Sequence, residues 1–332
     1  MEDNKKCGCK GIRTCLICQP DIQESEKDCM VIEKYIYCPH CNLCWPTNKN
    51  AKSPLYLGHI KLFLNFINPE EEESLINSID QIPWSPSQSG RKKQDFGPKV
   101  NFKKKKAKIG NFKGLPKFSQ TILERFQQCK ELSDFYPVEL CHLDYSPDRG
   151  SAIDPHIDDF WIWGGRLVTV NLASSTVLTL SPANLENCKC SIESKKDFFD
   201  EILLKEPIAE LSCSHQLACF ESTSIDPKKL VQITHNNIDN GESEYIADMC
   251  SMYRRYANET KVEIQIVLPP RSLLILGGCS RYNWFHAIKR QDISSRRLAM
   301  TFRELSESFL EDDNEKKLAD ELLELGRIFF NP

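Results

Sequence analysis

Short stretches that alternate apolar and polar residues, separated by turns containing glycine or proline, constrain the fold of this chain more than any other feature. Alternation with a period of two indicates a β-strand with one buried face. Alternation is clearest in residues 138–145, 262–268 and 297–303, and residues 166–172, 175–180 and 272–276 are further predicted strands. Many strands and few helices favour a mainly β (α+β) protein with a double-stranded β-helix, or jelly-roll, core and flanking helices.

Changes in composition divide the chain into three parts. We interpret residues 1–50 as a Cys-rich segment, residues 55–310 as the jelly-roll domain and residues 311–332 as a C-terminal helix. Residues from about 181 to 260 are polar, and we interpret them as an insertion. The start of the chain has no apolar leader, and no apolar run has the length of a membrane span. We therefore expect an intracellular protein with no membrane partner.

Eight of the 16 cysteines lie within the first 44 residues. In a reducing compartment such clustering indicates metal ligands rather than disulfides. Cysteine pairs separated by one or two residues can hold a tetrahedral zinc ion. We therefore predict a zinc site at Cys7, Cys9, Cys15 and Cys18. An iron–sulfur cluster, free thiols and a second site in the 38–44 stretch remain alternatives.

Residues 90–114 are strongly basic, with ten Lys or Arg against the single acid Asp95. Phe96, Phe102 and Phe112 are interleaved with them. This combination suits a polyanion with bases that can stack. An acidic protein surface would be attracted equally well, and a solvated loop with buried Phe side chains is the alternative. The formal net charge of −4 excludes a uniformly basic nucleic-acid binder.

His156 and Asp158 are separated by one residue, so on an extended strand their side chains point to the same face. An imidazole and a carboxylate are two of the three ligands in the two-His, one-carboxylate triad that holds non-haem iron. His286 is the candidate third ligand. Alternatively, the His-x-Asp is a surface feature and His286 a core residue.

The final predicted strand carries two arginines on one face. Arg297 and Arg303 share that face, whereas Leu298, Met300 and Phe302 share the opposite, apolar face. Buried guanidinium groups are costly unless they are paired, and their fork matches a carboxylate. A small dicarboxylate beside a metal would pair both. A surface strand with two solvated arginines is the alternative.

These residues resemble the iron and 2-oxoglutarate signature of the AlkB dioxygenases, with His156-x-Asp158, His286 and Arg297-x5-Arg303 in the same order. Tyr145 resembles the family's cofactor-contacting tyrosine. The longer stretches at 7–18, 87–102, 150–159 and 301–306 resemble one branch of the family, so the resemblance spans nearly the whole chain. Two departures are Leu143, where many relatives have Asn, and a longer gap between the last two ligands, which we place in the insertion.

The resemblance implies that His156, Asp158 and His286 bind iron(II). It also implies that Arg297 binds the distal carboxylate of 2-oxoglutarate, that Arg303 and Tyr145 line the same pocket, and that residues 90–114 form a substrate-recognition lid. The implied reaction, with O2 and 2-oxoglutarate as co-substrates, oxidatively removes N-methyl groups and releases formaldehyde and succinate.

The resemblance associates this branch with two substrates, monomethyl-lysine in actin and 6-methyladenine in DNA. On the resemblance alone we favour protein lysine, with a role in actomyosin and cytokinesis, and DNA adenine as a second activity, in cytoplasm and nucleus. The alternative is a catalytically idle dioxygenase scaffold. It would act, with its zinc segment, as an interaction module in actomyosin or chromatin organisation.

Overall fold

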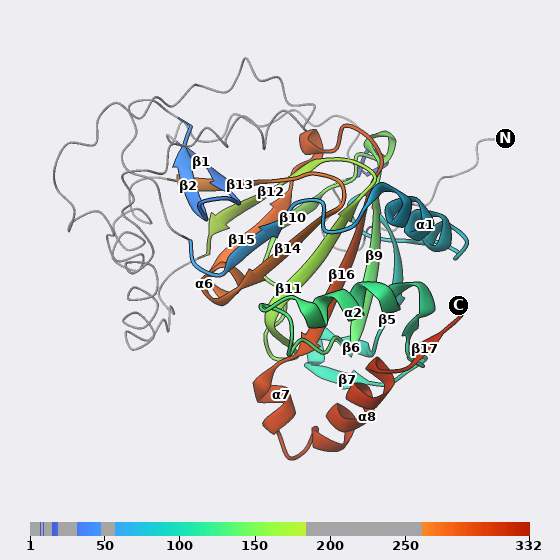
Figure 1. Ribbon diagram of the computed structural model, residues 1–332. Coiled ribbons are helices and arrows are strands. Elements are labelled where there is room, and N and C mark those ends of the chain that lie inside the picture. Colours follow the sequence, from blue (N-terminus) through green and yellow to red (C-terminus); the bar gives the residue numbers. More distant parts are fainter. Residues whose placement is uncertain (1–6, 8, 10–14, 19–31, 48–56, 184–260) are drawn as a thin grey trace, which may run out of the picture.

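A computed structural model describes residues 7, 9, 15–18, 32–47, 57–183 and 261–332 (Figure 1). Its centre is formed by eight strands in two sheets. These strands are β9 (Glu139–Tyr145), β10 (Ile153–His156), β11 (Trp163–Leu172), β12 (Thr176–Pro182), β13 (Lys261–Leu268), β14 (Ser272–Gly277), β15 (Trp284–Ile288) and β16 (Arg297–Leu305).

The order of these strands is that of a jelly roll. One sheet contains the run β10-β15-β12-β13 and the other the run β14-β11-β16-β9. Sequence neighbours therefore alternate between the sheets, except for the antiparallel pair β12 and β13. Leu180 and Ile264 of one sheet and Leu167 and Leu274 of the other share a core between them. The predicted double-stranded β-helix is confirmed.

Further strands extend both sheets. β1 (Ile32–Cys38) pairs in parallel with β13 and antiparallel with β2 (Leu43–Pro46). The larger sheet gains β3 (Ile60–Phe63), β4 (Ser85–Pro86) and β5 (Lys92–Phe96). The predicted boundary at residue 50 therefore differs from the structure, because residues 32–46 are part of a jelly-roll sheet. Tyr35 and Tyr37 of β1 explain this, since both side chains are buried in the core between the sheets.

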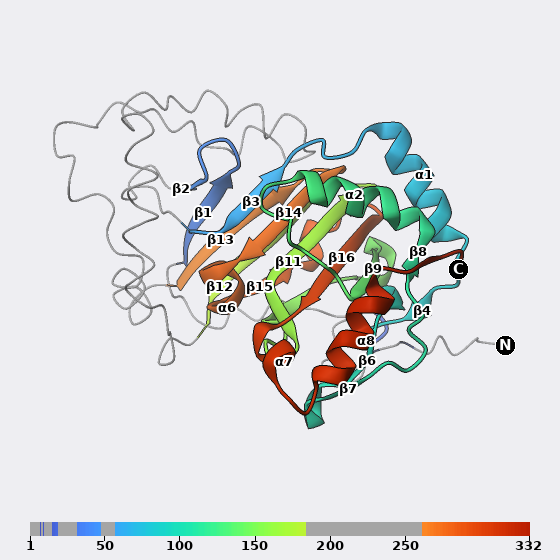
Figure 2. The same ribbon diagram turned by 60° about the horizontal axis from the view of Figure 1, so that its bottom comes forward.

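Helices cover the outer face of the larger sheet, as Figures 1 and 2 show together. The helices of the described part are α1 (Pro69–Asp80), α2 (Gln120–Gln128), α6 (Gly278–Tyr282), α7 (Glu307–Glu311) and α8 (Lys316–Gly326). Ile79 of α1, Phe126 of α2 and Leu322 of α8 belong to one core with Phe302 of β16. None of these helices is long and apolar enough to span a membrane.

The C-terminal part differs from the single predicted helix over 311–332. A turn separates α7 from α8, and in it the Asp312 carboxylate accepts a hydrogen bond from the backbone N–H of Asn314. After α8 the chain forms the short strand β17 (Phe329–Phe330), which pairs with β8 (Leu115–Pro116).

Residues 184–260 lie outside the described residues, as does most of the predicted insertion. Its flanking strands are described, and Thr176 of β12 lies opposite Leu268 of β13 in their antiparallel ladder. The insertion therefore lies between two neighbouring strands of one sheet.

The aromatic contact between sheet and helices gives a stability prediction. Phe302 is fully buried, and its ring meets that of Phe126 edge-on with centroids 5.2 Å apart. We expect Phe302→Ala to lower the free energy of unfolding, measured by urea denaturation, by about 3–5 kcal/mol. Phe102→Ala is the control, because Phe102 is 49% exposed and its loss should cost within about 0.5 kcal/mol. Equal effects of the two substitutions would contradict the packing described.

Candidate active site

Two neighbouring strands bring the predicted metal ligands together. β10 ends at His156, and the antiparallel pairing of β10 with β15 places His156 opposite His286. Asp158 follows β10 directly, and its Oδ1 lies 3.4 Å from His156 Nε2 and 4.0 Å from His286 Nε2. One potential ligand atom from each residue lies within 4.8 Å of the others.

Both imidazoles are arranged to present a nitrogen lone pair. His156 Nδ1 lies 2.8 Å from the carbonyl oxygen of Asp154, which only accepts, so Nδ1 donates and Nε2 is left to face Asp158. Burial, and then the neighbouring His156, lower the pKa of His286 to about 3. His286 is therefore neutral, and its contact with Asp158 is not an ion pair.

Two arginines hold Asp158, one at its carboxylate and one at its backbone carbonyl. Its Oδ2 accepts a 2.7 Å hydrogen bond from Arg303 Nε, and its backbone carbonyl accepts one of 2.9 Å from Arg281. Burial opposes ionisation, but the Arg303 guanidinium holds the pKa of Asp158 well below its usual range. Oδ1 of an ionised carboxylate thus remains directed at both imidazoles.

This donor set fits a divalent metal. Two neutral imidazoles and one carboxylate are the ligand types of the non-haem iron triad. The Asp158 and His286 side chains are only 10% and 12% exposed, whereas His156 is 35% exposed. Among the described residues, no hydrogen-bond partner lies near the buried Nδ1 of His286. The three side chains would hold iron(II).

Arg297 lies deeper in the same pocket. Its side chain is buried, its Nε donates a 2.6 Å hydrogen bond to Asn171 Oδ1, and its guanidinium lies 4.7 Å from the ring centroid of Tyr145. Burial lowers the pKa of Arg297. Within the described part of the chain, Arg297 makes no ion pair with a carboxylate. A buried cation without a counter-ion fits the distal carboxylate of 2-oxoglutarate.

Arg303 also lines the pocket, but its guanidinium is paired with carboxylates of the protein. Both Asp158 and Glu139 pair with its guanidinium, and they raise its pKa although burial acts to lower it. Protein carboxylates thus already pair with Arg303, and its hydrogen bond orients Asp158. Contact between Arg303 and a bound dicarboxylate stays a prediction.

Apolar side chains form the walls of this pocket. Tyr145 lies beside Arg297, as predicted, and the side chain of Leu143 forms part of the wall. The remaining apolar lining is Ile153, Leu167, Leu178, Leu268, Leu274, Leu276, Ile288 and Ala299. Such walls exclude water and strengthen the electrostatic interactions inside.

The structure separates the N-terminal cysteines into two sets. The thiols of Cys7, Cys9, Cys15 and Cys18 lie within 4.8 Å of one another. Among the described residues, the cysteines at 38, 41 and 44 form no such group, and residue 29 lies outside the described part. Burial acts to raise the pKa of the Cys9 thiol, but hydrogen bonds from the backbone of Gly90 and from Cys15 lower it to about 7.

Comparison with known proteins gives three relatives along nearly the full chain. Alpha-ketoglutarate-dependent dioxygenase alkB homolog 4 of Mus musculus is 39% identical over 335 residues, covering 98% of this chain and 95% of the relative. The Homo sapiens protein of the same name is 36% identical, covering 98% and 94%. A Caenorhabditis elegans protein named DNA N6-methyl adenine demethylase is 30% identical, covering 97% and 94%. No family model matches.

Among solved structures, the structure of OsALKBH1 aligns with a TM-score of 0.38 and 12% sequence identity, covering 75% of this chain and 100% of that chain. A Pseudomonas putida prolyl-4-hydroxylase aligns with a TM-score of 0.36 and 10% identity, covering 74% and 94%. TM-scores this low do not support a fold assignment, so the jelly-roll assignment is based on the strand order.

Proposed function

The chain belongs to the AlkB family of 2-oxoglutarate-dependent dioxygenases, and from this membership we propose that it oxidatively removes N-methyl groups from a macromolecule. The observation that carries the proposal is one pocket in which His156, Asp158 and His286 converge beside the buried, counter-ion-free Arg297. A catalytically idle interaction module has no need of this complete set, so we favour the enzyme.

We propose a distinct role for each side chain. His156, Asp158 and His286 hold iron(II), and Arg297 binds the distal carboxylate of 2-oxoglutarate beside Tyr145. When bound, iron with 2-oxoglutarate and O2 supplies the hydroxylation of the N-methyl carbon, with succinate and carbon dioxide as co-products. Arg303 keeps Asp158 Oδ2 occupied, so that Oδ1 stays directed at the metal position. The hydroxylated substrate then releases formaldehyde and the free amine.

We propose 6-methyladenine in DNA as the substrate to test first. The C. elegans relative is named for this activity. A basic hairpin also supports it, formed by β6 (Lys99–Asn101) and β7 (Lys106–Lys108). It follows β5 at the sheet end where Glu139 lies opposite Arg303. The side chains of Lys103 to Lys106 and of Phe102 are exposed there. Lysines can bind phosphates, and an aromatic ring can stack on a base.

Monomethyl-lysine in actin is the second candidate, because an acidic protein surface would also suit this hairpin. It would connect the enzyme with actomyosin and cytokinesis in the cytoplasm, whereas a DNA substrate would require the nucleus. The two substrates separate in one assay, formaldehyde release from 6-methyladenine DNA and from a monomethyl-lysine actin peptide. Release from the peptide alone would replace DNA with protein lysine, and release from neither would overturn the demethylase proposal.

The basic hairpin gives a prediction about DNA binding. Replacing Lys104 and Lys106 with Gln should weaken DNA binding. The plot of log affinity against log salt, whose slope is negative, should become less steep by up to about 2, roughly one for each lost phosphate contact. The matched control replaces Lys316 and Lys317, which are equally exposed on α8. Equal slopes for the two double variants would show that the hairpin does not contact DNA.

We also propose that the thiols of Cys7, Cys9, Cys15 and Cys18 hold one zinc ion. Four cysteine sulfurs within 4.8 Å of one another suit a closed tetrahedral site, which contributes to folding rather than to catalysis.

A further inference from the structure

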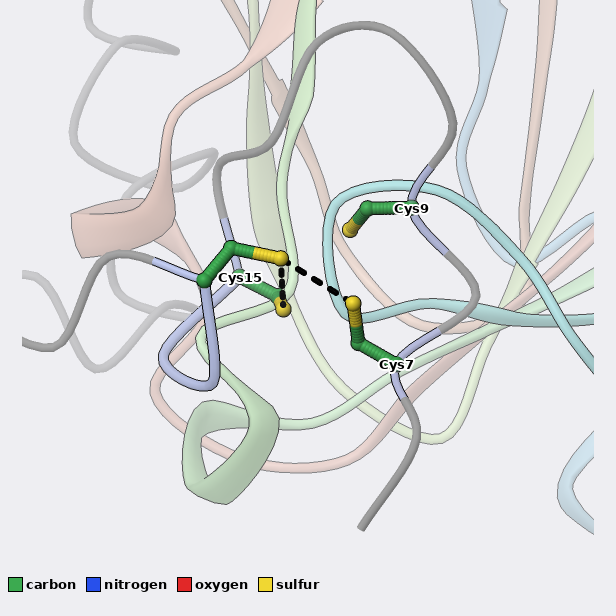
Figure 3. Close-up of side chains that lie close together, drawn as sticks. Cys7, Cys9 and Cys15 are labelled. Atoms are coloured by element: carbon green, nitrogen blue, oxygen red, sulfur yellow. Dashed lines mark hydrogen bonds between the residues drawn. The ribbon is translucent and has the colours of Figure 1, made fainter. Parts of the chain in front are cut away.

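Sulfur atoms from the N-terminal segment gather at one point. Figure 3 shows the side chains of Cys7, Cys9 and Cys15 directed toward one another. Cys18 Sγ lies 3.0 Å from Cys7 Sγ and 3.5 Å from Cys15 Sγ. Zinc–sulfur bonds of about 2.3 Å in a tetrahedron place sulfurs about 3.8 Å apart, so a single ion fits this cluster after small shifts.

This thiol cluster rests on the jelly-roll domain. The backbone N–H of Ser89 donates a 3.2 Å hydrogen bond to Cys9 Sγ, and the backbone N–H of Leu16 donates one of 3.3 Å to the Arg149 carbonyl. Gly90 has a φ of +71°, and a Cβ there would lie 2.3 Å from the Arg149 carbonyl oxygen and 3.3 Å from Cys15 Cβ. A glycine is therefore needed where the cluster meets the domain.

The loop that receives Cys9 also holds the strand of a proposed iron ligand. The hydroxyl of Ser89 donates a 3.2 Å hydrogen bond to Asp154 Oδ2, and its carbonyl accepts one of 3.0 Å from Ala152. The Asp154 carbonyl in turn accepts the proton of His156 Nδ1 at 2.8 Å. A continuous series of hydrogen bonds thus runs from Cys9 through Ser89 and Asp154 to His156.

Ser89 is itself in a costly backbone conformation. Its φ is +53°, in the left-handed region that a non-glycine residue rarely adopts, and it is 2% exposed. Such a conformation persists only when surrounding contacts determine it. Its bonds to Cys9 on one side and to the β10 segment on the other supply those contacts.

We propose that the four-thiol zinc centre is a positioning device for the active site, which fixes the loop at Ser89 and, through Asp154, the orientation of His156. This inference rests on the proposed function for the role of His156 as an iron ligand. Groups that orient a metal-bound histidine through its second ring nitrogen affect metal binding strongly. Zinc in the N-terminal segment therefore increases the affinity of the active site for iron(II).

The test uses the full chain, purified anaerobically, with elemental analysis for zinc and titration with iron(II) in the presence of 2-oxoglutarate. We expect one zinc ion per chain in the wild type and in the control Cys129→Ser, whose thiol lies outside the cluster. Cys9→Ser should lose the zinc, and its iron(II) affinity should fall by about 10- to 100-fold. Ser89→Ala keeps the N–H that faces Cys9, so it should retain the zinc but lose about tenfold in iron(II) affinity.

The outcomes separate this inference from the proposed function. Unchanged iron(II) affinity in Cys9→Ser and Ser89→Ala would overturn the positioning role and leave the dioxygenase assignment intact. A Cys7–Cys18 disulfide in place of zinc in the anaerobic wild type would also overturn it. A wild type that binds zinc but no iron(II) would instead contradict the proposed active site.

Discussion

Asp158→Asn should lower both the iron(II) affinity and the rate of succinate formation by more than about 100-fold. Residues that only orient a ligand already change metal affinity by about 10- to 100-fold, and Asp158 is proposed as a ligand itself. The substitution keeps the shape of the side chain but removes the negative charge that faces His156 and His286. Arg303 would retain Glu139 as its partner, so the pocket should keep its structure.

Asp148→Asn is the matched control for this substitution. It is the same chemical change on an exposed residue in the turn before β10, and it should alter neither quantity. Iron(II) affinity is measured by anaerobic titration, and thermal unfolding verifies that both variants are folded. Wild-type iron(II) affinity in Asp158→Asn would remove Asp158 from the metal site, whatever its effect on turnover.

Only part of the site could be predicted from local strand geometry. A period of two places Arg297 with Arg303, and the one-residue spacing of His156 and Asp158 suggested a shared face, although Asp158 lies just after β10. His286 joins them because β15 pairs with β10. The electrostatic state of the arginines could not be predicted in this way. Arg303 is opposite Glu139 because β16 neighbours β9, and this pairing joins residues far apart in the chain.

A weaker signal for Glu139 was present in the sequence. It shares a face of the predicted strand 138–145 with Tyr145, the residue already assigned to the pocket. Arg281 offered no comparable signal, since it lies in the short helix α6 and reaches the Asp158 carbonyl through tertiary packing. Local periodicity thus identifies the side chains that face the pocket, whereas the partner of each charge depends on which strands become neighbours.

The fold, like the site, could be predicted where it depends on local patterns but not where it depends on long-range pairing. The alternating strands of the jelly roll were visible, but β1 was hidden among the cysteines of the first 44 residues. In its parallel pairing with β13, Tyr35 lies opposite Ile264, and no local sequence pattern predicts a contact between residues so far apart in the chain. Composition alone therefore assigned to the metal segment a strand that belongs to the domain.

Arg297→Met should raise the KM for 2-oxoglutarate by roughly 30- to 4,000-fold. Removing one partner of a buried, hydrogen-bonded charge pair costs about 2–5 kcal/mol, and each 1.4 kcal/mol is a factor of ten. Without 2-oxoglutarate the substitution should change the free energy of unfolding by no more than about 1 kcal/mol. The hydrogen bond to Asn171 is lost, but so is the cost of a buried guanidinium that has no carboxylate partner.

This combination of effects distinguishes a ligand-binding arginine from a structural one. A structural role would lower stability in the absence of 2-oxoglutarate, whereas a binding role lowers only the stabilisation that 2-oxoglutarate adds, measured as a thermal shift under anaerobic conditions. Arg296→Met is the control, because this neighbouring arginine pairs with Asp80, is 41% exposed and should leave the KM unchanged. A wild-type KM in Arg297→Met would contradict the assignment of the buried guanidinium to 2-oxoglutarate.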